Sequence, residues 1–265
     1  MLPAAWVIVE NGSTDDTLEV ARGFAKDHPW ITVLSRAGET VPTRGGPIAR
    51  AFEAGLEALD TEPAVVVIVD ADVSFGPEYF ERLMEKFAAD PRLGMASGGR
   101  HEFTRGEWRR HNPTGSTTVE GQCRAYRWAC LPDVLPLQDA MNWDGIDAIK
   151  ANLKGWTTRT FFDFGYKHHR TMGTRDGSRA EAWATEGRGA YYMRYRPYYL
   201  FLRSLHHARR EPAALGLLWG YVSAAIHRDP RCPDQDVVEF LRRDQSLRNI
   251  IRRGREATGR TVNAR

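Results

Sequence analysis

The sequence predicts an α/β fold, a doubly wound and mostly parallel sheet followed by a helical extension rich in aromatic residues and arginine. Two observations carry this prediction. Up to about residue 100, short β-branched runs alternate with helical periodicities, which is typical of a parallel sheet covered on both faces. Beyond residue 178 the strand pattern stops and helical segments with many Tyr and Arg residues follow. We therefore expect two parts, residues 1–178 and residues 179–265.

The first half of the sheet part is predicted element by element. The run AWVIVE opens it, and Ser13 or Thr14 can cap the helix that follows, with Asp15 and Asp16 at the positive end of its dipole. The run VVVIV at 65–69 has no polar break and is typical of a buried strand. We expect strands at 5–10, 31–36, 65–69 and 93–100, and helices at 15–26, 48–59 and 77–90.

The second half of the sheet part is less regular. A stretch rich in Arg, Gly and Thr at 100–118 predicts a mobile basic loop. Gly155 predicts the end of a helix, because glycine adopts the left-handed conformation that often closes one. We expect a strand leading into a short helix at 121–131, a helix at 143–154 and a strand at 157–164.

Two helices are expected in the extension. The apolar run at 213–226 is shorter than the roughly 20 residues that a membrane-spanning helix needs. We expect a buried helix there, with an interfacial membrane helix as the alternative. Residues 236–253 predict an amphipathic helix whose apolar side chains lie roughly on one side. These side chains are Val237, Leu241, Leu247 and Ile251.

Composition points to an anionic partner and a reducing compartment. The net charge is +3 and nearly all basic residues are Arg, whose planar guanidinium suits phosphate and carboxylate groups; composition bias of the genome would explain the same count. The three cysteines form no Cys-x-x-Cys pair, and no signal-peptide pattern is present, so we expect a cytoplasmic protein. The Tyr- and Arg-rich stretch at 191–199 favours packing or a lipid headgroup surface over nucleic-acid stacking.

Two carboxylates follow the strand at 65–69. In an extended segment residues i and i+2 project to the same side, so Asp70 and Asp72 can converge on one cation at the mouth of the sheet. Hard ions such as Mg²⁺ or Mn²⁺ take oxygen ligands and keep positions open for substrate phosphate. The alternative is an acidic turn that only caps the next helix.

Several segments in order resemble the family 2 glycosyltransferases, which have the GT-A fold. VIVENGSTDDT is similar to the strand-end segment of that family, and Arg44-Gly45-Gly46 to its glycine-containing loop. VDADV resembles its DXD motif, and GQCRAYR resembles a Gly-x-x-x-x-Tyr-Arg segment on the acceptor side. WDGIDAIKANLKGW, followed by a strand and His168-His169, resembles the helix that carries the catalytic base and the later histidine.

The resemblance implies a role for each matching residue. Asp144 is the expected general base, with Asp147 as the alternative. Asp72 is expected to bind the metal directly and Asp70 to contact ribose or metal; His169, or less favourably His168, is expected to be a further ligand. The residues expected at the nucleotide or donor are Glu10, Asn11, Ser13, Arg44, Asp70 and Arg127.

The implied activity is inverting, metal-dependent transfer of a sugar from a nucleotide-sugar donor to a hydroxyl acceptor, with Mg²⁺ or Mn²⁺. The acceptor would be a glycan or a lipid-linked molecule of polysaccharide or glycolipid biosynthesis, reached by peripheral contact of the C-terminal part with the inner membrane face. Two alternatives stay open. A sugar-1-phosphate nucleotidyltransferase should carry a Gly-rich phosphate loop near its start, and none is seen. A non-catalytic nucleotide- or sugar-binding protein of the same fold is the other.

The family normally begins with one more strand and helix than this sequence shows. The chain opens at Met1-Leu2-Pro3, directly before what would be the second strand. The absent strand is central in such sheets, so the strands on either side of it are expected to have exposed edges. The sequence-based hypothesis is a truncated reading of an active gene.

Overall fold

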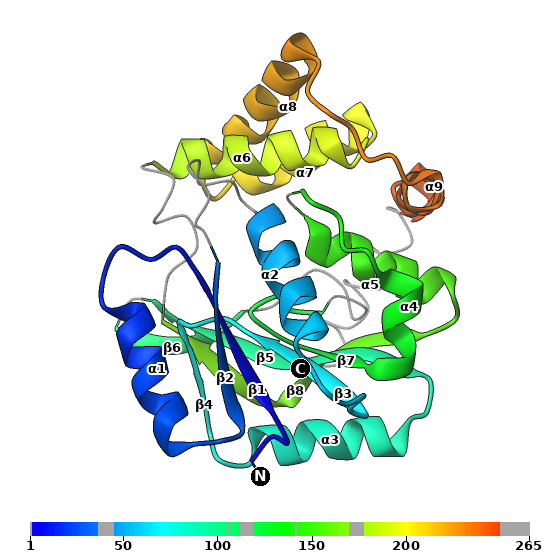
Figure 1. The fold of residues 1–265 in the computed structure, drawn as a ribbon. Coiled ribbons are helices and arrows are strands. Elements are labelled where there is room, and N and C mark those ends of the chain that lie inside the picture. The colour runs from blue at the N-terminus through cyan, green and yellow to red at the C-terminus, as the bar shows by residue number, and fades with distance from the viewer. Residues whose placement is uncertain are drawn as a thin grey trace. The chain divides into compact units, whose positions relative to one another are not determined.

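The computed structural model describes residues 2–36, 45–104, 106–111, 119–140, 142–169 and 178–249. The chain forms two compact units, residues 1–170 and residues 171–265 (Figure 1). Unit 1 contains the strands and unit 2 is helical. Arg44 lies outside the described residues.

Unit 1 is a mixed α/β structure, as the sequence predicts. Its strands are β1 (Trp6–Asn11), β2 (Ile31–Arg36), β3 (Val65–Val69), β4 (Val73–Phe75), β5 (Leu93–Thr104), β6 (Glu107–Arg110), β7 (Cys123–Arg127) and β8 (Thr157–His168). Its helices are α1 (Thr17–Asp27), α2 (Gly46–Glu57), α3 (Tyr79–Ala89), the 3-10 turn η1 (Trp128–Cys130), α4 (Leu131–Val134) and α5 (Trp143–Leu153).

The strands form two sheets whose pairings are mixed rather than mostly parallel. β1 and β2 form a parallel pair. The larger sheet has the order β3-β7-β5-β8-β4, with β6 paired to β5, and only its β5–β8 pairing is parallel. The prediction failed here because helical crossovers connect only some strands. The β5–β6 hairpin, by contrast, reverses the chain within a few residues, which places antiparallel neighbours side by side.

The larger sheet is covered on both faces (Figure 1). On one face lies α3, whose Tyr79, Leu83 and Phe87 repeat every four residues and pack against Phe164 and Tyr166 of β8. On the other face lie α2, α4 and α5. This second core includes Met95 and Tyr126 from the sheet, Leu131 and Ala148 from α4 and α5, and Phe52 from α2.

Strand β3 is less buried than its composition predicts. All five of its β-branched residues are only half-buried or exposed, and Val69 is 36% exposed. Among the described residues β3 pairs only with β7, and β1 pairs only with β2. Both strands therefore lie at sheet edges, which explains why an uninterrupted apolar run is incompletely covered.

The predicted basic loop is partly a hairpin. β5 continues to Thr104, and β6 returns beside it with Phe103 opposite Trp108 and His101 opposite Arg110. Gly106 has φ +84, a left-handed conformation that suits glycine in a tight turn. Residues 112–118 lie outside the described part of the chain.

Unit 2 consists of α6 (Arg179–Tyr192), α7 (Pro197–Ala208), the 3-10 turn η2 (Pro212–Leu215), α8 (Gly216–His227) and α9 (Gln235–Asp244). α6 and α8 pack closely because Gly187 and Gly220 lie at their contact. A Cβ on Gly220 would meet the carbonyl oxygen of Ala184 at 1.8 Å, so no larger residue fits there. α9 ends at Asp244, earlier than the sequence predicts, and Leu247 is 57% exposed.

Helix α8 is only half-buried, in contrast to the buried helix that its apolar sequence predicts. Leu217 and Ala224 are buried in unit 2. The other side of the helix exposes a stripe of large apolar side chains, which we call the α8 stripe: Leu215, Trp219, Val222 and Ile226. Among the described helices, none has the length and apolar character needed to cross a membrane.

Candidate active site

Asp70 and Asp72 lie in the short turn between β3 and β4 in unit 1. Asp70 N–H donates to the Gln122 carbonyl (2.9 Å), which ties the end of β3 to the segment before β7. The Asp72 carbonyl accepts from His169 N–H (2.8 Å), which ties the turn to the end of β8. Ala71 and Asp72 form a turn rather than extended strand. The alternation rule that predicted a shared side for the two aspartates therefore does not apply to this segment.

His168, not His169, is the histidine that lies beside Asp72. His168 Nε2 is 3.4 Å from Asp72 Oδ1, and the imidazole is buried. In the parallel β5–β8 register His168 is paired with Glu102, and its Nδ1 lies 3.9 Å from Glu102 Oε1. Asp72, Glu102 and His168 therefore form a cluster, which we call the strand-end cluster.

His169 is exposed and points to other partners. Its Nε2 is 2.7 Å from Ser74 Oγ, and its ring packs edge-on against Trp108 at 5.3 Å. The resemblance in sequence favours His169 over His168 as a ligand, whereas in the structure His168 is the one beside Asp72. His168 is the last residue of β8 and His169 follows the strand, where its ring turns to Ser74 and Trp108.

A buried network extends from the strand-end cluster. Arg100, 3% exposed, has Nη1 3.5 Å from Glu102 Oε1 and Nε 3.4 Å from Glu120 Oε2. His111 Nδ1 lies 3.1 Å from Glu120 Oε1. Burial acts to raise the pKa of Glu120, but the hydrogen bond to His111 and the Arg100 charge outweigh it and lower that pKa. The lowered pKa keeps Glu120 ionised at neutral pH.

Asp147 is occupied by a buried ion pair. Arg124 Nη1 lies 2.6 Å from both Asp147 carboxylate oxygens, and the Tyr126 hydroxyl donates to the same carboxylate. Arg124 and Tyr126 are fully buried and Asp147 is 1% exposed. Burial acts to lower the pKa of the Arg124 guanidinium, but the Asp147 charge outweighs it and raises that pKa. A carboxylate so enclosed cannot reach an acceptor, so the placement argues against Asp147 as the base.

Asp144 lies one turn earlier on α5 and is half-buried. Its carboxylate lies over Gly121, where a Cβ would meet Asp144 Oδ2 at 3.0 Å. Arg124 Nη1 donates to the Asp144 carbonyl (2.7 Å), so the buried pair also holds the first turn of α5 in place. The backbone of Asp70 and the carboxylate of Asp144 therefore contact the same two-residue segment, Gly121-Gln122.

Glu10, Asn11 and Ser13 form a second group at the end of β1. Glu10 is buried and accepts from the Ser13 N–H and from Ser35 Oγ (3.2 Å). The Ser13 hydrogen bond lowers the pKa of the Glu10 carboxyl most, against the effect of burial. Asn11 is exposed. Glu10 thus stabilises the loop that presents Asn11 and Ser13, in line with a position beside a ligand.

The structure does not bring Arg127 to the other predicted residues. It pairs with Val65, at the opposite end of β3 from Asp70. Its guanidinium donates to the carbonyls of Phe87 (2.6 Å), Asp90 (2.9 Å) and Leu93 (3.0 Å). The placement therefore argues against a donor-binding role for Arg127. Arg124 sits on the same strand and was missed, although its alternation with Tyr126 places both on one face.

Glu102, Glu120 and Gln122 were also missed, and only Glu102 had a signal in the sequence. It lies two residues from Arg100, so both can face one side of a strand. The link between Glu120 and Arg100 depends on β5 and the segment before β7, which meet only in the folded sheet. Gln122 Oε1 accepts from Tyr166 Oη (3.2 Å), another contact between distant segments.

The chemistry of the strand-end cluster fits a divalent cation. Glu102 Oε1 and His168 Nδ1 are buried, and neither has a hydrogen-bond partner among the described residues. Carboxylate oxygen and imidazole nitrogen are donors that Mn²⁺ accepts. In the described part of the chain, no group of three or more such side chains is already arranged to hold an ion. The donor types are therefore present, but the described side chains do not surround a common cation position.

Comparisons with known proteins identify relatives of this chain. Residues 5–142 match the model of the family described as glycosyl transferase family 2. No individual curated protein matches in sequence. The fold is similar to the mannosyltransferase PcManGT from Pyrobaculum calidifontis in complex with GDP-Man and Mn²⁺, with a TM-score of 0.55 and 16% identity over 96% of this chain and 74% of that one. It is also similar to GalNAc-T7 with UDP, GalNAc and Mn²⁺, with a TM-score of 0.52 and 11% identity over 91% of this chain and 51% of that one.

Proposed function

The chain belongs to glycosyl transferase family 2, and from that premise we propose that it transfers a sugar from a nucleotide-sugar donor to a hydroxyl acceptor with inversion at the anomeric carbon. The observation that carries the proposal is that the end of β3 at Asp70 and the half-buried Asp144 carboxylate both contact the segment Gly121-Gln122. One carboxylate lies at the strand end and the other is half-buried at the start of a helix. This arrangement suits a reaction with one group at the donor and another at the acceptor.

Asp144 is the proposed general base. Among the described residues no hydrogen bond engages its carboxylate, whereas Asp147 is fully occupied. In the reaction Asp144 takes the proton of the acceptor hydroxyl while that oxygen forms a bond to the sugar C1. The bond between C1 and the diphosphate oxygen breaks, and the diphosphate leaves with the electron pair. A base on the face opposite the leaving group gives inversion.

Asp72, with Asp70 and His168, would hold the divalent cation. A bound cation neutralises charge that develops on the departing diphosphate. The chain's own part is to position these donors: the β4–β8 register pairs His168 with Val73, next to Asp72, and Arg100 holds Glu102 on the other side of His168. The structures of PcManGT and GalNAc-T7 contain Mn²⁺, which supports a divalent ion of this kind.

Glu10, Asn11 and Ser13 are the proposed contacts to the nucleotide, together with Arg44. Asn11 is exposed on a loop that Glu10 braces through Ser13. The printed ligands of the similar structures are nucleotide sugars or their parts, which supports a donor of that class. Unit 1 is proposed to contain the whole donor site.

The acceptor is proposed to belong to polysaccharide or glycolipid biosynthesis, with the protein in the cytoplasm and at the inner membrane face. The α8 stripe supports the membrane contact, because Trp219 is 67% and Ile226 71% exposed on one side of the helix. Exposed Trp and large aliphatic side chains of this kind can enter the membrane interface. Sedimentation with anionic liposomes tests this point, and a Trp219→Ser, Ile226→Ser variant should remain in the supernatant.

The test of the transfer itself starts with donor binding. Thermal shift is measured with UDP, GDP and dTDP, with and without Mn²⁺, on the wild type, on Asp72→Asn and on Asp60→Asn, an exposed aspartate at the other end of β3. We expect a metal-dependent shift that Asp72→Asn loses and Asp60→Asn keeps. The anomeric configuration of the product, read by NMR, then tests inversion. Metal-independent binding equal in all three proteins would contradict the proposed donor site.

A further inference from the structure

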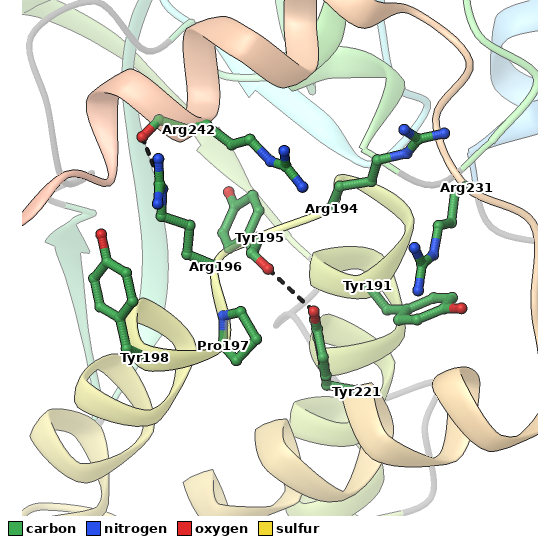
Figure 2. A pocket seen from close by; sticks show the side chains of 9 residues that line it. All are labelled: Tyr191, Arg194, Tyr195, Arg196, Pro197, Tyr198, Tyr221, Arg231 and Arg242. Atoms are coloured by element: carbon green, nitrogen blue, oxygen red, sulfur yellow. Dashed lines mark hydrogen bonds between the residues drawn. The ribbon is translucent and has the colours of Figure 1, made fainter.

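A pocket of about 400 Å³ lies within unit 2, and its lining includes none of the residues proposed above for donor binding, metal binding or catalysis. Figure 2 shows the side chains around it, which come from the end of α6, the turn after it, the start of α7, α8, the segment after α8 and α9. A volume of this size is within the range of small-ligand sites, roughly 300–1,000 Å³.

The described residues that line this pocket include four arginines and no carboxylate; the arginines are Arg194, Arg196, Arg231 and Arg242. The tyrosines between them add aromatic walls. Arg231 lies over the Tyr191 ring at 4.6 Å, and Tyr221 Oη donates to the Tyr195 carbonyl (3.1 Å). Four cations held together without a lining anion repel one another, which an anionic ligand would relieve.

Arg194 is the most constrained of the four. Its φ of 53 places it in the left-handed region, which is uncommon for a residue other than glycine. Backbone hydrogen bonds hold it there, from Arg194 N to the Tyr191 carbonyl and from Tyr195 N to the Ala190 carbonyl, each 3.0 Å. Its Nε is buried with no hydrogen-bond partner among the described residues. A charged donor left in this way is costly unless a ligand accepts from it.

The start of α7 adds to the positive character. Pro197 is the first residue of this 12-residue helix and lines the pocket, and in the described part of unit 2 no side-chain hydrogen bond caps the helix start. The first N–H groups of a helix have no intrahelical acceptor and attract anions. Arg196 is positioned beside it by Nε, which donates to the Arg242 carbonyl (3.0 Å, dashed in Figure 2).

We propose that this pocket binds a phosphate-bearing ligand. A phosphate group has several acceptor oxygens and can satisfy guanidinium groups that approach from separate elements, which a single carboxylate cannot do. The volume exceeds that of one phosphate, so a diphosphate or a phosphate with an attached group fits. The site lies entirely in unit 2 and does not depend on the function proposed for unit 1.

The experiment measures binding of inorganic pyrophosphate to the full chain by calorimetry in EDTA at low salt. EDTA removes the cation that the proposed donor site needs, so binding there does not contribute. We expect Arg231→Gln and Arg242→Gln each to weaken binding about tenfold, the value of one charge-assisted hydrogen bond. Both residues are exposed, so the variants should fold, and thermal melting checks this.

Arg243→Gln is the matched control. Arg243 is the neighbour of Arg242 on α9 but lies outside the pocket, where it pairs with Glu239 (2.8 Å). Pyrophosphate should bind this variant as it binds the wild type. Equal binding by the wild type and both pocket variants, or no binding by the wild type in either this arm or the next, overturns the proposal.

A second arm identifies the source of the phosphate. Phosphatidylcholine vesicles containing phosphatidic acid are compared with vesicles of equal charge containing phosphatidylserine. Preferential sedimentation with phosphatidic acid that Arg242→Gln loses and Arg243→Gln keeps identifies a lipid headgroup. Pyrophosphate binding without such a preference identifies a soluble phosphate compound, and both results support the pocket.

Discussion

Asp144 and Asp147 lie one turn apart on the same helix, yet their surroundings differ in every respect. Asp147 is 1% exposed, and Arg124 and Tyr126 occupy its oxygens. Asp144 is half-buried beside Gly121, and among the described residues nothing hydrogen-bonds its carboxylate. The same chemical group thus supports the structure in one place and is available for chemistry in the other.

A buried carboxylate whose oxygens are all paired, such as Asp147, stabilises the fold. A half-buried carboxylate without hydrogen bonds, such as Asp144, is available to react. Arg124 connects the two, because it binds the Asp147 side chain and the Asp144 carbonyl at once. The interior pair therefore orients the helix start that presents Asp144. Substitutions at the two aspartates and at their neighbours should therefore have different consequences.

Asp147→Asn should destabilise the protein by about 3–5 kcal/mol, because removing one partner leaves the Arg124 charge buried and uncompensated. The free energy of unfolding, measured in urea, is the readout. Asp144→Asn is the control and should change that free energy by less than about 0.5 kcal/mol, as is usual for a group without partners. Similar losses of unfolding free energy in both variants would contradict the assignment of a supporting role to Asp147 alone.

Asp144→Asn should instead lower the rate of sugar transfer by about 10²–10⁴-fold, the usual contribution of a general base. Binding of the nucleotide, measured by thermal shift, should stay as in the wild type, because Asp144 is proposed to act on the acceptor. Full transfer activity in this variant would remove Asp144 from the reaction.

Tyr126→Phe should cost about 1–2 kcal/mol in the free energy of unfolding, because it leaves one Asp147 oxygen with one fewer donor while it keeps the packing. Urea unfolding measures it. Tyr166→Phe is a useful comparison, since Tyr166 is equally buried but bonds to the neutral Gln122 side chain (3.2 Å). A smaller loss is expected there.

Gly121→Ala should lower the transfer rate about tenfold by displacing Asp144, as small misplacements of a reacting group do. The added Cβ would lie 3.0 Å from Asp144 Oδ2, so that carboxylate must move. Stability should change little. Gly23→Ala is the control, because nothing lies within 4 Å of a Cβ at that position. An unaltered rate in Gly121→Ala would show that Asp144 does not need its present position.

The smallest expected effect is on the free energy of unfolding at acid pH. Because the pKa of Glu120 is lowered in the folded state, its contribution to stability is fully present above its unfolded pKa and is lost as pH falls through the folded pKa. Glu120→Gln should therefore flatten the loss of unfolding free energy on the acid side of about pH 4.5. An unchanged pH profile would show that the Arg100–Glu120–His111 network does not form.

Much of the secondary structure of unit 1 could be predicted from local sequence patterns. The strands at 6–11, 31–36 and 65–69 and the helix at 143–153 were predicted within one or two residues, because alternation and helical periodicity are local properties. The prediction of a mostly parallel sheet was wrong, because the direction of strand pairing depends on how segments far apart in the chain come together. The family resemblance was confirmed by the match over residues 5–142.

The sequence by itself determined the order of the elements and the candidate residues Asp72 and Asp144, since their motifs are contiguous. Only the tertiary structure decided that His168 rather than His169 faces Asp72, that Arg124 encloses Asp147, and that four arginines of unit 2 share one pocket. Each of those facts depends on which side of a strand or helix meets a segment far away in the chain. Local periodicity sets the side, but packing between distant segments sets the partner.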